Sequence, residues 1–208
     1  DIHIKLLKKH NPDFSEVFLN SGAHIQHHYF RNSEFYDYEV KNNPDWYIKS
    51  QYDPFKDLLA SFDLIVKDYL NLNKYELIFS TGLSQTPIEP TFYYRLKNHE
   101  KFMNKLNVPF LKIVPRMTRD FTMYFESKIQ RDSAIEKLSN IEDIKGEKLF
   151  DEIEIRDDSI FVTLTYPKEI NDETRFKNFE EIINIHKDVV FVALKNGKHD
   201  SKSYTFTT

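Results

Sequence analysis

The clearest pattern in the sequence is a run of apolar residues at helical spacing between residues 54 and 70. An apolar side chain recurs every three or four positions, at Phe55, Leu58, Leu59, Phe62, Ile65, Val66, Tyr69 and Leu70. This is the period of an α-helix with one buried face. Asp53 precedes the run and Pro54 opens it, and both residue types are typical of a helix N-terminus. The pattern therefore predicts a helix over residues 54–70.

Shorter apolar runs, bounded by turn residues, predict the other elements. We expect strands at 16–19, 75–80, 110–114, 121–125, 150–155, 160–166 and 189–194. We expect further helices at 2–9, 98–106, 127–138 and 175–185. The remaining assignments are a loop at 31–52, a turn at 81–87 and a hairpin turn at 156–158.

The order of these elements predicts the fold class. Strands and helices alternate through residues 14–114, which favours an α/β fold with a mostly parallel sheet flanked by helices. Residues 117–166 instead predict a small antiparallel β-α-β-β subdomain. We therefore expect an α/β core portion at 1–114, this subdomain at 115–170, and a return to the core sheet at 171–208.

Composition removes several function classes. Aromatic residues make up 15% of the 208 residues, but there are only 4 glycines. Neither the G-x-G-x-x-G nor the P-loop nucleotide motif can be written with them. The absence of cysteine excludes disulfides and Cys-based zinc sites. A net charge of −4 argues against a nucleic-acid or membrane-surface binder.

No apolar run approaches the roughly 20 residues that cross a membrane, and no signal peptide is visible. We therefore expect a cytoplasmic protein with no membrane span and no nucleic-acid partner.

Histidines provide the first candidate site. In a helix, His24 and His28 would share a face, and His24 and His27 would lie one turn apart, so two imidazoles could reach one cation. Asn20 lies four residues before His24, directly after an expected strand. His199 also follows an expected strand, and ligands of α/β sheets bind beyond such strand ends. The alternative is that these histidines pack and bind the backbone.

Two segments that mix basic and aromatic residues are candidate anion sites. Tyr94 and Arg95 belong to the first, and Arg116 lies in the second, at 115–120. Arginine can donate two parallel hydrogen bonds to an oxyanion, and tyrosine stacks on sugar rings. The alternative is that these segments only lead into neighbouring elements and that the arginines pair with local acids.

The order of these motifs resembles the C-terminal portion of the alkaline-phosphatase-like superfamily, most nearly its type I phosphodiesterase and nucleotide pyrophosphatase branch. That branch has D-x-x-G-H after a strand, and here Asn20 stands in place of the Asp and His24 in place of the His. A long helix with an Asp near its middle follows, and here residues 54–70 carry Asp63. The last motif is G-x-H, and here it is 197–199, ending in His199.

The resemblance departs from the family at three ligands. Asn20 replaces a carboxylate, and Thr81 and Gly82 stand where the family has an Asp-His pair. The resemblance therefore implies one divalent ion, zinc or manganese, held by His24 and His199 with help from Asn20 or His28. It implies no second ion.

The function that the resemblance implies is that of a portion of a metal-dependent phosphoester, or sulfoester, hydrolase with a divergent site. Its substrate would be a small-molecule or glycan phosphoester, held by Arg95, Arg116 and Tyr94. The family's nucleophile would lie upstream of Asp1, in an N-terminal remainder of the same protein. The alternative is a non-catalytic binding or structural relative with an aromatic-rich cleft for a carbohydrate or glycan precursor. On the first hypothesis, His24 and His199 should lie within about 7 Å of each other.

Overall fold

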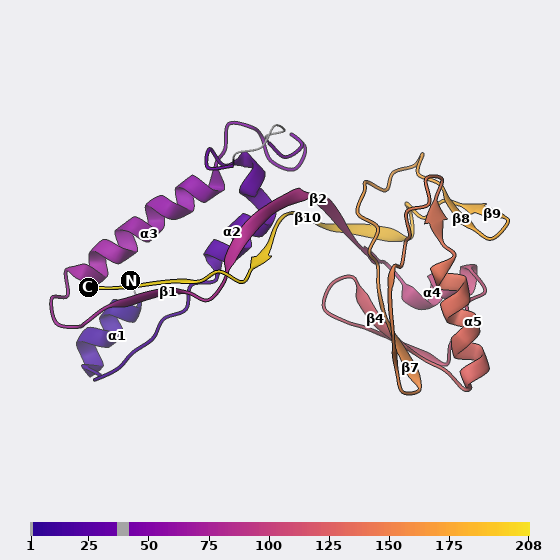
Figure 1. The fold of residues 1–208 in the computed structure, drawn as a ribbon, viewed down its shortest axis with the longest axis horizontal. Helices are drawn as coiled ribbons and strands as arrows, with labels where there is room; N and C mark the ends of the chain where they lie inside the picture. The colour runs from indigo at the N-terminus through magenta and orange to yellow at the C-terminus, as the bar shows by residue number, and fades with distance from the viewer. Residues whose placement is uncertain (1, 37–41) are drawn as a thin grey trace. The chain divides into compact units, whose positions relative to one another are not determined.

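The computed structural model describes residues 2–36 and 42–208 and has a mixed fold (Figure 1). Its helices are α1 (Ile2–His10), α2 (Ser21–Tyr29), α3 (Pro54–Leu70), α4 (His99–Lys105) and α5 (Lys128–Ser139), with a 3-10 turn η1 at Phe30–Asn32. Its strands are β1 (Ile78–Thr81), β2 (Ser84–Leu96), β3 (Lys112–Pro115), β4 (Asp120–Tyr124), β5 (Glu142–Asp143), β6 (Glu152–Arg156), β7 (Ser159–Thr163), β8 (Phe176–Asn178), β9 (Glu181–Ile183), β10 (Val189–Asp200) and β11 (Tyr204–Thr207).

The chain forms two units. Unit 1 comprises Asp1–Glu89 and Lys195–Thr208, and unit 2 comprises Pro90–Leu194. The long strands β2 and β10 pair with each other, and each contributes residues to both units. The chain therefore enters unit 2 along one strand of this pair and leaves it along the other.

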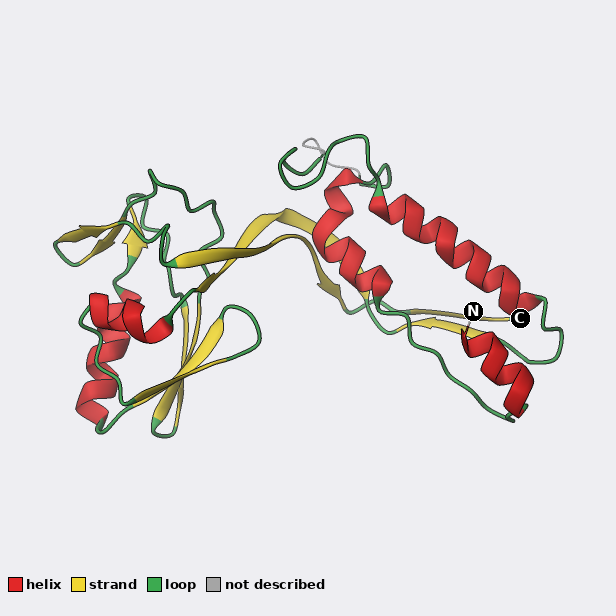
Figure 2. Ribbon diagram, turned by 180° about the vertical axis from the view of Figure 1, so that it is seen from behind, coloured by secondary structure: helices red, strands yellow, loops and turns green. Residues whose placement is uncertain are grey.

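The expected mostly parallel sheet flanked by helices is wrong, because the described strands form only small antiparallel sheets. Apart from the long pair β2 and β10, their arrows are short (Figure 2). Residues 16–19, expected as a strand, lie outside any strand, and Phe18 is 81% exposed. The strand expected at 75–80 pairs instead with β11 at the far end of the sequence. Antiparallel pairs of this kind replace the helical crossovers that a parallel sheet requires.

Two more expectations are corrected. Residues 175–185 do not form a helix but the β8–β9 hairpin, and Phe179 at its turn has φ of +54°. The turn expected at 81–87 is much shorter, because only Gly82 and Leu83 separate β1 from β2. Part of the loop expected at 31–52, residues 37–41, lies outside the described residues.

The helix expected at 54–70 is confirmed with the same bounds as α3. One carboxylate oxygen of Asp53 accepts the backbone N–H groups of Phe55 and Lys56, at 3.1 and 2.9 Å. This satisfies donors that have no partner within the first turn. The hairpin expected around 156–158 is confirmed as well, since β6 and β7 pair on either side of Asp157 and Asp158.

The hydrophobic core belongs to unit 2. In its four-stranded sheet, in the order β3-β4-β7-β6, Phe121 lies opposite Val162 and Met123 opposite Ile160, and all four are buried. The α4 and α5 helices add Phe102, Met103, Ala134 and Leu138 to the same cluster. By contrast, the buried hydrophobic side chains among the described residues of unit 1 are Leu7, Phe30, Tyr36 and Tyr69. Unit 1 therefore depends more heavily on polar contacts for its order.

Candidate functional site

The two histidine segments of the sequence meet in unit 1, where α2 lies beside β2 and β10 (Figure 1). The ring centroids of His24 and His28 are 4.7 Å apart. The rings of His27 and His199 meet edge to face at 4.8 Å. We call His24, His27, His28 and His199 the histidine cluster. The expected partner of His199 was His24, but the ring that contacts it is His27, one helical turn further along.

The cluster forms because a helix and a strand each place their side chains on one facing surface. Residues three and four apart share a helix face, which groups His24, His27 and His28 on α2. Alternate residues share a strand face, which groups Lys195 and His199 on β10, on either side of Gly197.

Gly197 allows α2 to approach β10 closely. A Cβ atom at this position would lie 2.9 Å from the side-chain oxygen of Gln85 and 3.0 Å from the backbone oxygen of Gln26. Contacts this short force the neighbouring atoms to move. The end of the Gln85 side chain can move aside, but the Gln26 backbone would have to give by a few tenths of an ångström, so a larger residue here would strain the junction of α2, β2 and β10.

His27 is anchored to the backbone of β10. Its Nδ1 donates a hydrogen bond of 2.8 Å to the carbonyl of Gly197. Because a carbonyl only accepts, Nδ1 carries the proton and Nε2 carries the lone pair of the neutral ring. A metal-binding histidine is held in this same way. Burial lowers the pKa of His27, and the charges of Lys195, His199 and His24 lower it further, while the Gly197 bond opposes them.

His28 links a lysine to an aromatic group. Its Nε2 lies 3.5 Å from the ammonium of Lys195, and its Nδ1 lies 3.4 Å from the hydroxyl of Tyr47. An ammonium only donates, so Nε2 accepts and Nδ1 donates to Tyr47. The Tyr47 ring stacks on Tyr29 at 5.6 Å and meets Trp46 edge to face at 5.8 Å. Tyr29, Trp46 and Tyr47 therefore form an aromatic group that borders the histidine cluster.

The metal-binding capacity of the cluster is small. Within residues 2–36 and 42–208, no group of three or more His, Cys, Asp or Glu side chains is arranged to hold a metal ion. His27 and His199 are in ring contact, and the tautomer of His27 is fixed by its bond to Gly197. Asn20 precedes α2, and its side chain caps no backbone group. Asp63 is exposed on α3, and Thr81 lies at the end of β1.

The residues expected to hold the substrate belong to unit 2. Tyr94 is 5% exposed, lies in the hydrophobic core, and accepts the backbone N–H of Ile170 at 2.9 Å. These contacts indicate a packing role for its ring. Arg95 is exposed on β2, and its charge adds to burial in lowering the pKa of His99. Arg116 is exposed, and its Nε donates to the hydroxyl of Thr122 at 3.0 Å.

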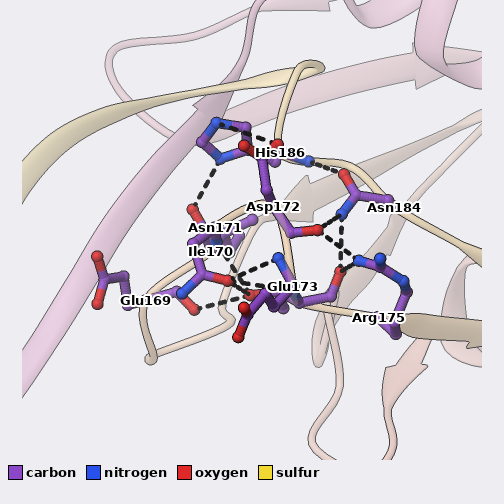
Figure 3. A network of polar contacts seen from close by, with 9 residues as sticks. Glu169, Ile170, Asn171, Asp172, Glu173, Arg175, Asn184 and His186 are labelled. Carbon is purple, nitrogen blue, oxygen red and sulfur yellow. Dashed lines mark hydrogen bonds and ion pairs between the residues drawn. The ribbon is translucent and has the colours of Figure 1, made fainter.

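A second polar cluster lies in unit 2 around residues 169–186, where Figure 3 shows the side chains converging on one loop. The Asn171 carboxamide oxygen accepts from the backbone N–H groups of Glu173 and Thr174. The Asn184 amide donates to the carbonyls of Asp172 and Thr174. His186 donates through Nδ1 to the carbonyl of Ile170. These bonds close the loop onto the residues after β9, which is a structural role.

Sequence reasoning missed Lys195 and the pairing of His27 with His199. The signal that could have found both is the alternation of Lys195, Gly197 and His199. It was hidden because the strand was expected to end at residue 194, whereas β10 continues to Asp200.

Comparisons of the chain with protein-family models, with curated proteins and with solved structures give no match. Within the part of the chain that the structure describes, no helix combines the length and apolar character needed to cross a membrane. The site is therefore interpreted from its own geometry.

We expect unit 1 to lose stability in acid through His27. Its folded pKa lies below the usual value of 6.5, so the stabilisation is present above that value and is lost as the pH falls through the folded pKa. Urea unfolding between about pH 8 and pH 5, followed by the fluorescence of Trp46, the single tryptophan, measures this loss. His27→Gln should reduce the loss. His10→Gln, at an exposed position, is the control, and equal slopes in the two variants would contradict the assignment.

Gly197→Ala should destabilise unit 1 and disrupt the histidine cluster. The new methyl group collides with Gln85 and with the Gln26 backbone, and overpacking of this kind costs about 1–3 kcal/mol. Gly82→Ala is the matched control, because a Cβ there meets no atom within 4 Å. Trp46 fluorescence during urea unfolding, together with the ring signals of His27 and His199 in NMR spectra, provides the readout. Equal stability of the two variants would show that the close approach is unimportant.

Proposed function

We propose that this protein acts on a phosphoester, or a sulfoester, at a divalent metal ion that unit 1 holds through His27 and His199. The observation that carries the proposal is the state of His27. Its Nδ1 is bound to the Gly197 carbonyl at 2.8 Å, which leaves the lone pair on Nε2, and its ring contacts that of His199. The resemblance of the sequence motifs to alkaline-phosphatase-like hydrolases supports the choice of substrate.

The proposal rests on side chains and not on the fold, because the parallel sheet implied by the resemblance is replaced by small antiparallel sheets. Thr81 and Gly82 supply no ligand for a second ion, so the proposal includes one ion only. A bound divalent ion would act as a Lewis acid toward the ester oxygen. Two imidazole ligands leave coordination positions open for water and substrate, but they also imply weak binding.

The proposal predicts metal binding that depends on both histidines. Calorimetric titration of the protein with Zn²⁺ or Mn²⁺ should show binding, and the melting temperature should rise. His27→Ala and His199→Ala should each weaken binding by at least about tenfold, because each removes one of two ligands. His10→Ala is the control and should bind as the unchanged protein does. Absence of both heat and thermal shift, or equal losses in all three variants, would refute the metal site.

A second candidate is a non-catalytic carbohydrate-binding protein. The observation that favours it is the aromatic group beside the histidine cluster: Trp46 is 57% exposed and meets Tyr47, whose hydroxyl contacts His28. Aromatic faces of this kind stack on sugar rings.

This candidate predicts that neutral oligosaccharides change the fluorescence of Trp46 in the presence of EDTA. Trp46 can report on its own environment, and Tyr47→Ala should weaken the response because it removes the neighbouring ring. Phe179→Ala is the control, since Phe179 is an exposed aromatic residue of unit 2. A response that needs added metal would favour the first candidate, and the absence of any response would exclude this one.

A further inference from the structure

We propose that Lys195, whose ammonium lies beside His28, forms an anion-binding arm next to the His27–His199 pair and that this arm binds the tetrahedral oxyanion of the ester. The inference rests on the proposed function, because it names a residue that would bind the substrate at that site. The arm itself requires no metal, so the two proposals can fail separately.

The position of Lys195 is set by the strand. It lies on the same face of β10 as Gly197 and His199, and α2 packs against this face at Gly197 and Lys195. Its ammonium lies 3.5 Å from Nε2 of His28, the residue that follows His27 on α2. Its charge also contributes to the lowered pKa of His27, which follows from their proximity. An anion at Lys195 would therefore be close to the proposed metal ligands.

The ammonium of Lys195 has a hydrogen-bond partner on α2. It donates to His28, which in turn donates to Tyr47, and Tyr47 is stacked on Tyr29. A lysine side chain normally loses much rotamer freedom when it binds a ligand. The contact with His28 limits that loss, which favours Lys195 as an anion ligand.

The positive charge of the Lys195 ammonium favours an anion at the arm. Imidazoles at 24, 27, 28 and 199 and the ammonium of Lys195 gather on the facing surfaces of α2 and β10. The nearby acids have partners of their own. Asp200 accepts a hydrogen bond from Thr86 at 3.3 Å, and Glu89 lies 3.6 Å from Arg31. Hydrogen bonds from cationic groups to an oxyanion are among the stronger ones in proteins.

The test is a titration with inorganic phosphate in EDTA, followed by calorimetry and by the NMR signals of the histidine rings. Lys195→Met should weaken phosphate binding by about tenfold or more, the contribution expected of one charged hydrogen bond. Lys195→Arg should retain most of the affinity, because it keeps the charge. Lys198→Met is the matched control: it removes the same charge from the same strand, at an exposed residue of the opposite face. Trp46 fluorescence confirms that each variant folds.

Each outcome decides the proposal. Selective loss in Lys195→Met supports the arm, and a parallel titration with sulfate shows whether the phosphoester or the sulfoester is preferred. Equal losses in Lys195→Met and Lys198→Met would mean general electrostatic attraction and would overturn it, as would a lack of phosphate binding by the unchanged protein. If phosphate binds but the titration with Zn²⁺ or Mn²⁺ shows no binding, the anion-binding arm is supported and the metal-dependent function is refuted.

Discussion

The histidine cluster depends on the close approach of α2 to β10 at Gly197. Two consecutive residues of β10 accept hydrogen bonds from the segment formed by α2 and η1. The Gly197 carbonyl accepts from His27, and the side-chain oxygen of the fully buried Asn196 accepts the backbone N–H of Arg31 at 3.3 Å. Any larger residue at 197 would separate these surfaces, and both hydrogen bonds would weaken together. The histidine cluster exists only because this separation is small.

The contrast between the two units explains why polar contacts carry so much of unit 1. Unit 2 contains the hydrophobic core, in which Phe121 and Ile160 are fully buried between sheet and helices. In unit 1, several large apolar side chains are exposed, including Phe14 and Phe18, each at 81%. Hydrogen bonds at the α2–β10 junction add to the contacts that order unit 1, and the candidate site is made of the same groups. Changes to the site and changes to the stability of unit 1 are consequently linked.

Residues close to an element in the sequence allowed that element to be predicted. The pairing of strands that are far apart in the sequence could not be predicted in this way. Asp53 and Pro54 lie within a few residues of the helix that they start, so α3 could be predicted to the residue. Nothing near Ile78 indicates that its partner is Thr207, yet that pairing decides between an antiparallel and a parallel sheet. The same difference between local and long-range features applies to the candidate site. The histidines were visible in the sequence, but the rotation of α2 and the length of β10 decide which ring meets His199.

The tautomer of His27 also determines how protons and metal ions compete at the site. A metal ion at Nε2 leaves the Nδ1 bond to Gly197 intact, so metal binding is compatible with the junction of α2 and β10. A proton at Nε2 keeps that bond too, but it places a second positive charge near Lys195 and beside His199, where the pKa of His27 is already lowered. Metal ions require the deprotonated nitrogen, so acid would weaken the proposed metal binding and the junction through the same atom. Phosphate at Lys195 would offset part of that positive charge. Anion binding, metal binding and the stability of unit 1 would then be coupled through one imidazole.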